Sequence, residues 1–230
     1  MQIVHDHEFL RCQPPQPLAD DEIHLWFFAP DTAPTAKSAP TSLLHELLST
    51  YLQTDPAMLR FDRTPYGKPF LLPPHDTYLQ FNLAHSADAL IVALSRAQTL
   101  GVDIEAIQRP RPWLELARRF FTAAEYAALA ALPPERLPAA FVELWSAKEA
   151  VLKALGRGIA FGLERLEFAL DPHGRVAGLR TIAAEGGAPA DWQLLRLAPG
   201  SGLCGTLAWR GPSMRVCSFR ASGSGNPNES

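Results

Sequence analysis

Two carboxylates, Asp103 and Glu105, flank Ile104 in the otherwise apolar segment 100–107, which has the composition of a β-strand. Successive side chains of a strand point to opposite faces, so both carboxylates are predicted to share one face. Two adjacent carboxylates repel each other unless a cation lies between them. Carboxylate oxygens, completed by water and substrate phosphate, are usual ligands of Mg²⁺. The pair is therefore a candidate Mg²⁺ site, although two solvated acids at a strand end would show the same pattern.

A second group of charged residues lies on a predicted helix that includes residues 144–155. At about 100° per residue its apolar side chains form one arc, and Lys148 falls inside that arc. A lysine in that position either extends its stem to solvent or contacts an anion. Glu149 and Lys153, four residues apart at the polar margin of the arc, form either a surface ion pair or part of a site.

Other polar residues are weaker candidates. His85 follows a predicted strand in FNLAHS, where it is a base, an anion contact or an ordinary loop residue. Lys68 lies in a Gly-Pro turn, YGKPF, of the kind that usually faces solvent. His5 and His7 bracket Asp6, an arrangement that fits a metal clip but is more typical of a solvated chain end.

Hydrophobic periodicity and turn residues predict the elements that position these side chains. In the first half the expected elements are a helix at 42–52 and strands at 24–29, 79–84, 89–95 and 100–107. In the second half they are helices at 113–121, 123–132 and about 137–155, and strands at 166–170, 192–197, 203–209 and 214–219. Thr122 and Glu125 form a capping box between the two short helices, and Gly156 is a left-handed C-cap.

The predicted fold class is α+β, with two similar lobes, each a helical layer on a mainly antiparallel sheet. The Arg-Pro repeat near residues 109–112 is placed between the lobes. This gives an N-terminal lobe of 1–108, a C-terminal lobe of 109–220 and a disordered tail at 221–230.

Composition excludes some classes of function. The 230 residues carry 21 Lys and Arg against 24 Asp and Glu, a formal net charge of -3, so no global field attracts nucleic acid or anionic lipid. The three cysteines form no CxxC motif, which favours a reducing compartment, and no segment is typical of a leader or a membrane span. We expect a cytoplasmic protein that binds neither nucleic acid nor membranes.

Five motifs occur in an order that resembles the 4'-phosphopantetheinyl transferase family, in particular its longer, pseudo-dimeric branch typified by the enzyme that activates surfactin synthetase. They are YGKP at 66–69, FNLAHS at 81–86, GVDIE at 101–105, RRFFTAAEY at 118–126 and WSAKEAVLKALGRG at 145–158. The most specific part is GVDIE followed some 40 residues later by WxxKExxxK.

The resemblance implies transfer of the phosphopantetheine arm of coenzyme A to a serine of an apo acyl, peptidyl or aryl carrier protein, with release of adenosine 3',5'-bisphosphate. It also implies a monomer whose two lobes are related by a pseudo-twofold axis. By match to the family's motifs, Asp103, Glu105 and Glu149 would hold Mg²⁺, and Glu149 would deprotonate the acceptor serine directly or through water.

The same match assigns the remaining site residues. Lys153 would neutralise charge on the pyrophosphate, and Lys68 and His85 would contact the 3'-phosphate of coenzyme A. Two departures concern that phosphate: Ala84 stands where the family usually has Ser, and the segment before the helix at 42–52 offers only Lys37 where the family carries basic residues.

The sequence suggests a docking surface for the partner and leaves alternative functions open. Carrier proteins are typically acidic, so the cluster Arg109, Arg111, Arg118 and Arg119 is predicted to steer docking, against the alternative of a solvated helix face. The alternative functions are a non-catalytic relative that binds coenzyme A or carrier proteins, and another Mg²⁺-dependent phosphotransferase on the same scaffold. A full set of three carboxylates favours the catalytic function, because a binding module does not need it.

Overall fold

The structure is a computed structural model, and it describes residues 2–5, 9–11, 17–29, 40–76, 78–96, 98–108, 110–200 and 202–221. Asp6, His7, Lys37, Arg109 and residues 222–230 lie outside the described residues, and only the backbone of His5 is described. The predictions made for these residues therefore have no structural counterpart.

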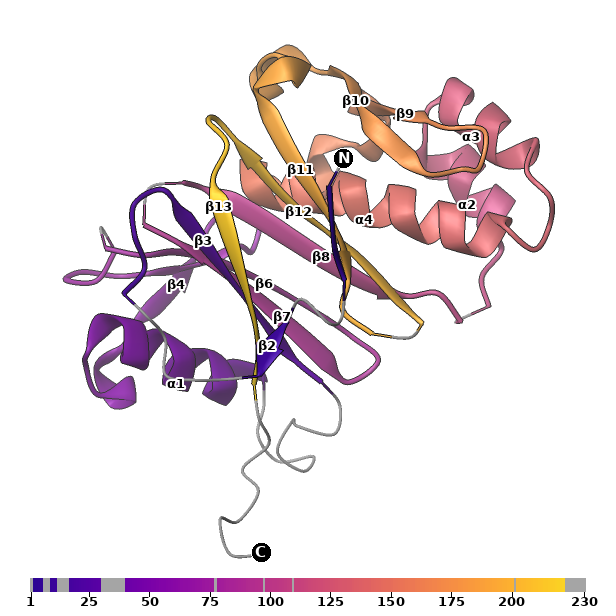
Figure 1. The fold of residues 1–230 in the computed structure, drawn as a ribbon. Helices are drawn as coiled ribbons and strands as arrows, with labels where there is room; N and C mark the ends of the chain where they lie inside the picture. Colours follow the sequence, from indigo (N-terminus) through magenta and orange to yellow (C-terminus); the bar gives the residue numbers. More distant parts are fainter. Residues whose placement is uncertain are drawn as a thin grey trace, which may run out of the picture.

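The chain folds into four layers (Figure 1). Helix α1 (Pro40–Leu52) packs on one face of a five-stranded sheet, and the other face of this sheet packs on a four-stranded sheet. Helix α4 (Leu137–Leu155) covers the outer face of the four-stranded sheet, with α2 (Trp113–Phe120) and α3 (Ala123–Ala130) beside it. The predicted α+β class is confirmed.

The five-stranded sheet has the order β2–β13–β3–β7–β6. Strand β7 is antiparallel to both β3 and β6, whereas β13 is parallel to both β3 and β2. Strand β7 is a continuous hydrophobic run because both of its faces are buried, one against α1 and one against the other sheet. The bounds are β2 (Leu10–Arg11), β3 (Glu22–Phe28), β6 (Gln80–Ser86), β7 (Ala89–Ser95) and β13 (Arg215–Arg220).

The four-stranded sheet has the order β1–β11–β12–β8. Strand β1 is parallel to β11, and the other two pairs are antiparallel. The bounds are β1 (Gln2–His5), β8 (Leu100–Ala106), β11 (Trp192–Ala198) and β12 (Leu203–Arg210).

Two small hairpins complete the strands: β4 (Phe61–Arg63) with β5 (Pro69–Leu71), and β9 (Leu166–Leu170) with β10 (Val176–Ile182). Strands β1, β2, β4, β5 and β10 were not predicted from the sequence. Short 3₁₀ turns lie at Pro56–Met58, Ile159–Phe161, Leu163–Arg165, Ala184–Gly186 and Pro189–Asp191.

The local signals for helix ends are confirmed. The Thr122 hydroxyl accepts a hydrogen bond from the Glu125 amide at 3.3 Å, and the Glu125 carboxylate accepts one from the Thr122 amide at 2.9 Å. Gly156 ends α4 with φ 68°, a left-handed conformation that glycine adopts without strain.

The two lobes repeat one arrangement. In each, a first strand, a helical layer (α1 in one lobe, α2 to α4 in the other), a hairpin and two further strands follow in order. The three long strands lie first–third–second in space, as β3–β7–β6 and as β8–β12–β11. The predicted boundary between residues 108 and 109 stays a prediction for the domains, but the sheets are not divided there. Strand β8, which that prediction assigned to the first lobe, pairs with β12, and β13 returns to pair with β3.

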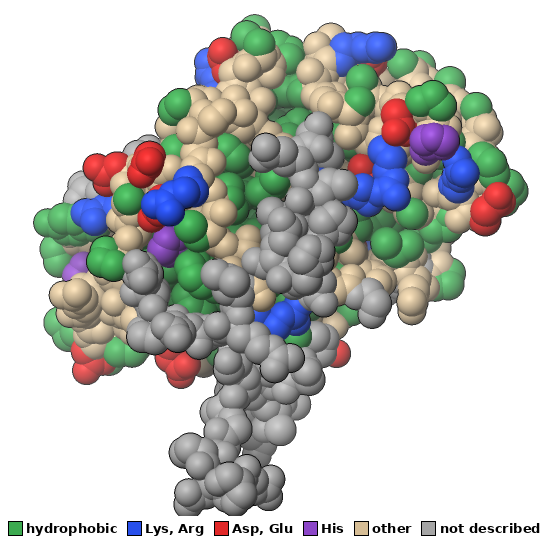
Figure 2. Space-filling view, in the orientation of Figure 1, with side chains coloured by type: hydrophobic (Ala, Val, Ile, Leu, Met, Phe, Trp, Pro, Cys, Tyr) green, Lys and Arg blue, Asp and Glu red, His purple; other side chains and the backbone are tan. Residues whose placement is uncertain are grey.

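The surface agrees with the small net charge. On the face shown in Figure 2, basic and acidic side chains are interspersed with hydrophobic and uncharged ones. Among the described residues, no helix has both the length and the apolar character needed to cross a bilayer.

Candidate active site

The site begins where β8 lies directly on α4. Leu100, Val102 and Ile104 face the core between the sheets, so the intervening residues of β8 face α4. A Cβ atom on Gly101 would lie 2.1 Å from the Ala150 carbonyl oxygen, which no side chain could accommodate. Glycine at this position therefore allows the strand to approach the helix backbone and brings the following carboxylates to α4.

Asp103 and Glu149 meet across this contact, with Lys153 one helical turn further along α4. The Lys153 ammonium donates hydrogen bonds to Asp103 Oδ1 at 2.8 Å and to the Val102 carbonyl at 3.1 Å. Asp103 Oδ2 and Glu149 Oε1 are buried and have no hydrogen-bond partner among the residues that the structure describes. Buried carboxylate oxygens are rarely left in this state, so the pair is open to a ligand.

Burial changes the acidity of both carboxyl groups. Desolvation raises the pKa of Asp103 to about 6, although Lys153 opposes the shift. Desolvation, followed by repulsion from Asp103, raises the pKa of Glu149 to about 7. Repulsion from Glu105 also raises the pKa of both groups, so the charges of the three carboxylates influence one another.

Glu105 has a cation of its own. An Arg111 guanidinium nitrogen lies 2.7 Å from Glu105 Oε2, and both side chains are about four-fifths buried. Sequence reasoning placed Arg111 only in the docking cluster, because the turn that brings it back to β8 could not be read from the residues. Ser146 was also missed, and its hydroxyl donates to the Asp103 carbonyl at 3.2 Å from one turn before Glu149.

The free edge of β8 bonds to side chains instead of another strand. Asn82 Oδ1 accepts from the Val102 amide at 2.8 Å, and the Ser86 hydroxyl accepts from the Ala106 amide at 3.0 Å. Both come from β6, the edge of the other sheet, so this seam joins the two lobes beside the carboxylates. The FNLAHS motif is thus partly explained by its role in the seam.

The structure brings Lys68 to the same helix but not to the carboxylates. Its ammonium donates to the Leu100 and Lys153 carbonyls, at 3.0 and 2.9 Å, and burial lowers its pKa to about 8. An ammonium has three donors, so one remains for an anion. Lys68 also lines a cavity of about 470 Å³ between the β4–β5 hairpin, β6 and the end of α4. His85 is exposed on β6.

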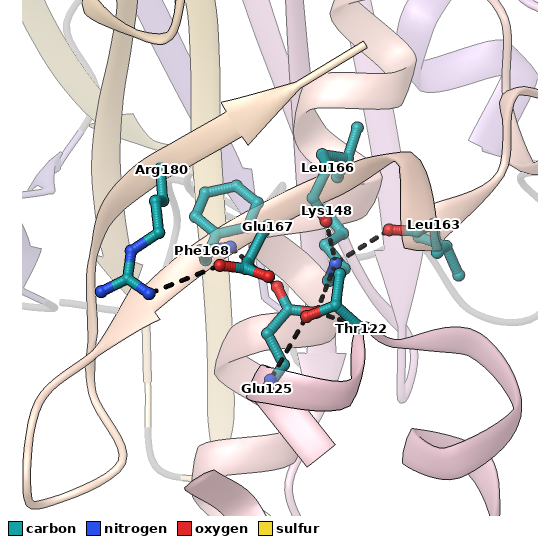
Figure 3. A network of polar contacts seen from close by, with 8 residues as sticks. All are labelled: Thr122, Glu125, Lys148, Leu163, Leu166, Glu167, Phe168 and Arg180. Carbon is teal, nitrogen blue, oxygen red and sulfur yellow. Dashed lines mark hydrogen bonds and ion pairs between the residues drawn. The ribbon is translucent and has the colours of Figure 1, made fainter. Parts of the chain in front are cut away.

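Figure 3 shows the network on the other side of α4, around Lys148. The Lys148 ammonium lies 2.8 Å from Glu125 Oε2, and both side chains are fully buried. It also donates to the Leu163 and Leu166 carbonyls, while Glu125 Oε1 accepts from the Phe168 amide at 2.8 Å. Of the two sequence-based alternatives for Lys148, the anion contact is confirmed, and its partner belongs to the capping box.

The donor set fits Mg²⁺. Two unpartnered, buried carboxylate oxygens and a third carboxylate nearby are hard oxygen ligands of the type that Mg²⁺ prefers, and they leave coordination positions for water and phosphate. Among the residues that the structure describes, no thiol or imidazole is part of this group.

Comparison with known proteins agrees with this geometry. Residues 99–205 match the family model of the 4'-phosphopantetheinyl transferase superfamily, a span that includes β8 and α4. The chain is 35% identical to the 4'-phosphopantetheinyl transferase HetI of a Nostoc species, over 89% of this chain and 94% of that protein.

Two further relatives are matched over shorter spans. The identity to the 4'-phosphopantetheinyl transferase Sfp of Bacillus subtilis is 34%, over 59% of this chain and 58% of Sfp. The identity to the 4'-phosphopantetheinyl transferase AcpT of Salmonella typhi is 39%, over 48% of this chain and 55% of AcpT. The chain belongs to the 4'-phosphopantetheinyl transferase family, and the resemblance drawn from its motifs is confirmed.

Proposed function

We propose that this protein transfers the 4'-phosphopantetheine group of coenzyme A to a serine of an apo carrier protein and releases adenosine 3',5'-bisphosphate. The observation that carries the proposal is the pair of buried carboxylates on β8 and α4, each with one unpartnered oxygen, next to the ammonium of Lys153. Phosphoryl transfer depends mainly on positioning and charge neutralisation, which this arrangement supplies.

Asp103, Glu105 and Glu149 would hold Mg²⁺. When bound, the ion supplies positive charge against the pyrophosphate and a fixed position for its oxygens. Glu149 would accept the proton of the acceptor serine, directly or through water, while the serine oxygen forms the new bond to phosphorus and the bond to the bisphosphate breaks. Lys153 has one donor beyond its hydrogen bonds to Asp103 and to the Val102 carbonyl, and would direct it to the pyrophosphate.

Lys68 and His85 would bind the 3'-phosphate. Support comes from the cavity that Lys68 lines and from its one remaining donor. Lys68 lies at the C-terminal end of α4, where it also offsets the helix dipole, so an anion would have to share this charge with two carbonyls.

The carrier protein would dock beside α2. Arg118 and Arg119 are exposed in its last turn, whereas Arg111 is held by Glu105. Charge reversal at Arg118 and Arg119 should therefore raise KM for the carrier without changing KM for coenzyme A. Reversal at Arg111 is a poor test of docking, since it would also disturb Glu105.

A cytoplasmic, monomeric enzyme fits these elements. Cys204 and Cys217 are free thiols, as expected in a reducing compartment, and both lobes of the proposed site come from one chain.

The test is intact-protein mass spectrometry of a panel of apo acyl, peptidyl and aryl carriers incubated with coenzyme A and Mg²⁺. We expect one phosphopantetheinyl group to be added to at least one carrier, and not to a variant that lacks its acceptor serine. The Glu164→Gln variant, changed at an exposed acid, serves as the matched control for Glu149→Gln. Binding of coenzyme A without transfer to any carrier would favour the non-catalytic relative.

A further inference from the structure

A second group of ligand-type side chains lies in the other lobe, at the beginning of β3 and β13. The parallel register of these strands pairs Cys217 with His24 and Arg215 with Glu22. Side chains two residues apart on a strand share a face, so Glu22 and His24 lie on one face with Cys217 beside them. This is the face that α1 covers, because Trp26 and Phe28 continue the same alternation into the α1 cluster.

The three potential ligand atoms converge. One carboxylate oxygen of Glu22, one ring nitrogen of His24 and the Cys217 sulfur all lie within 4.8 Å of one another. His24 Nε2 and Glu22 Oε2 are 3.4 Å apart. Glu22 and His24 are buried, whereas Cys217 is half-buried and its thiol is free, which leaves a route from solvent.

Neighbouring groups hold two of these side chains in place. His24 Nδ1 is 2.6 Å from the Tyr51 hydroxyl, which also accepts a hydrogen bond from the Trp26 indole at 2.8 Å. Glu22 Oε2 accepts from the Ala19 amide at 3.0 Å. Metal-binding histidines characteristically have their second nitrogen fixed in this way, so the Nε2 side of His24 is oriented toward the cluster.

The cluster already accommodates a cation. The Arg215 guanidinium contacts Glu22, yet the Arg215 side chain is 67% exposed and could turn into solvent. A metal ion that replaced it would keep the buried carboxylate neutralised.

We propose that Glu22, His24 and Cys217 form a metal site for Zn²⁺, separate from the carboxylates of β8 and α4. A thiolate, an imidazole and a carboxylate are the ligand types of zinc, and the sulfur and nitrogen donors disfavour Mg²⁺. Three protein ligands leave the fourth tetrahedral position to water. The ion would cross-link β13 to β3, two strands that are far apart in the sequence.

Cobalt substitution tests the site without any measurement of transfer. The full chain is titrated with Co²⁺ in excess Mg²⁺, which occupies the carboxylate site, and the thiolate-to-cobalt charge-transfer absorption is recorded. We expect one equivalent to bind with this absorption in the wild type. It should be absent in Cys217→Ala and retained in the matched controls Cys204→Ala and Cys12→Ala. His24→Gln should weaken Co²⁺ binding at least tenfold.

Zn²⁺ should also raise the unfolding temperature of the wild type in proportion to its binding, but not that of Cys217→Ala. Metal-free unfolding curves show whether each variant folds. The proposal is overturned if folded wild-type protein shows no charge-transfer absorption, or if Cys217→Ala retains it. It is also overturned if Zn²⁺ shifts both proteins equally, because the cluster is then only an internal hydrogen-bond network.

Discussion

Lys148 and Lys153 lie five residues apart on α4, and each has a carboxylate oxygen 2.8 Å from its ammonium nitrogen. Around Lys148 every polar group has a partner: Glu125 uses both oxygens, and two backbone carbonyls complete the shell. Around Lys153, Asp103 and Glu149 each keep an unpartnered oxygen within the described part of the chain. Helix α4 thus contributes to two ion pairs: a closed pair at Lys148, whose hydrogen-bonding groups are all satisfied, and an open pair at Lys153, where carboxylate oxygens lack a partner among the described residues.

The difference separates structure from function. A fully satisfied buried pair holds α3, α4 and β9 together, but it has no capacity left for a ligand. The incomplete pair raises the pKa of two acids, which costs stability in the free protein and provides a place for a cation. Acids with a raised pKa beside an ammonium therefore indicate an active site better than the closed pair does.

The largest expected effect comes from removing the open pair's charge. Glu149→Gln keeps the shape of the side chain but removes the proposed metal ligand and proton acceptor, so kcat/KM for transfer should fall at least a thousandfold, about 4 kcal/mol in the barrier. Asp103→Asn should lower kcat/KM for transfer to a similar extent. Steady-state kinetics with one carrier and circular dichroism of each variant provide the measurement. Rates within about tenfold of wild type would remove both residues from the site.

Substitution in the closed pair of Lys148 and Glu125 should act mainly on the stability of the fold. Lys148→Met leaves Glu125 buried without a cation, so the free energy of unfolding should fall by about 3–5 kcal/mol. Lys153→Met should cost much less stability, because Asp103 has a raised pKa and can take up a proton, yet it should abolish transfer. Urea unfolding at pH 7 compares them. The double variant Lys148→Met/Glu125→Gln should recover part of the loss, and equal losses in the two single variants would refute the contrast.

The open pair should also make stability depend on pH. Folding raises the pKa of Asp103 and Glu149, so the folded state binds more protons, and their contribution to stability is lost as the pH rises from about 4 to about 7. A shift of about two pKa units corresponds to about 3 kcal/mol for each group. Buried His24, whose pKa is lowered by desolvation, gives the opposite slope. The wild type is therefore compared with Glu149→Gln.

Urea unfolding in EDTA between pH 5 and 8 gives the two slopes. We expect Glu149→Gln to be the more stable protein at pH 8 and to lose less stability as the pH rises. Identical slopes would mean that Glu149 is not perturbed in the metal-free protein.

The smallest effect concerns Lys68, a third lysine at the same helix, whose contacts are two neutral carbonyls. Lys68→Ala should raise KM for coenzyme A about tenfold, the value of one charge-assisted contact. The same variant should change KM for 3'-dephospho-coenzyme A little. An equal loss on both donors would show that Lys68 supports the pyrophosphate or the fold instead of the 3'-phosphate.

Local signals in the sequence were enough for some of these features. Residue types alone indicate the capping box of Thr122 and Glu125, the C-cap at Gly156 and the shared face of Asp103 and Glu105, because each depends on neighbours within a few residues. The motifs of the family then supplied the link between Asp103 on β8 and Glu149 on α4, which lie more than forty residues apart in the sequence.

Other features depend on contacts that no local pattern contains. The partner of Lys148 is Glu125, and the cation of Glu105 is Arg111, and both pairs exist only once α3 and the turn before α2 are placed. Strand β10 was missed because its seven residues include a glycine and two strongly polar side chains, and pairing with β9 decides its conformation. The need for glycine at position 101 likewise becomes clear only from its close contact with the backbone of α4.

The position of β13 has a consequence for how the protein is made. It lies between β2 and β3, so the sheet of the N-terminal lobe is interrupted until residues 215–220 have left the ribosome. Until then β3, with Trp26, Phe27 and Phe28, is an open hydrophobic edge that can pair with other nascent chains. The N-terminal lobe should therefore complete its sheet only after β13 has been synthesised, and chains interrupted shortly before residue 215 should aggregate or recruit chaperones instead of accumulating as a folded first lobe.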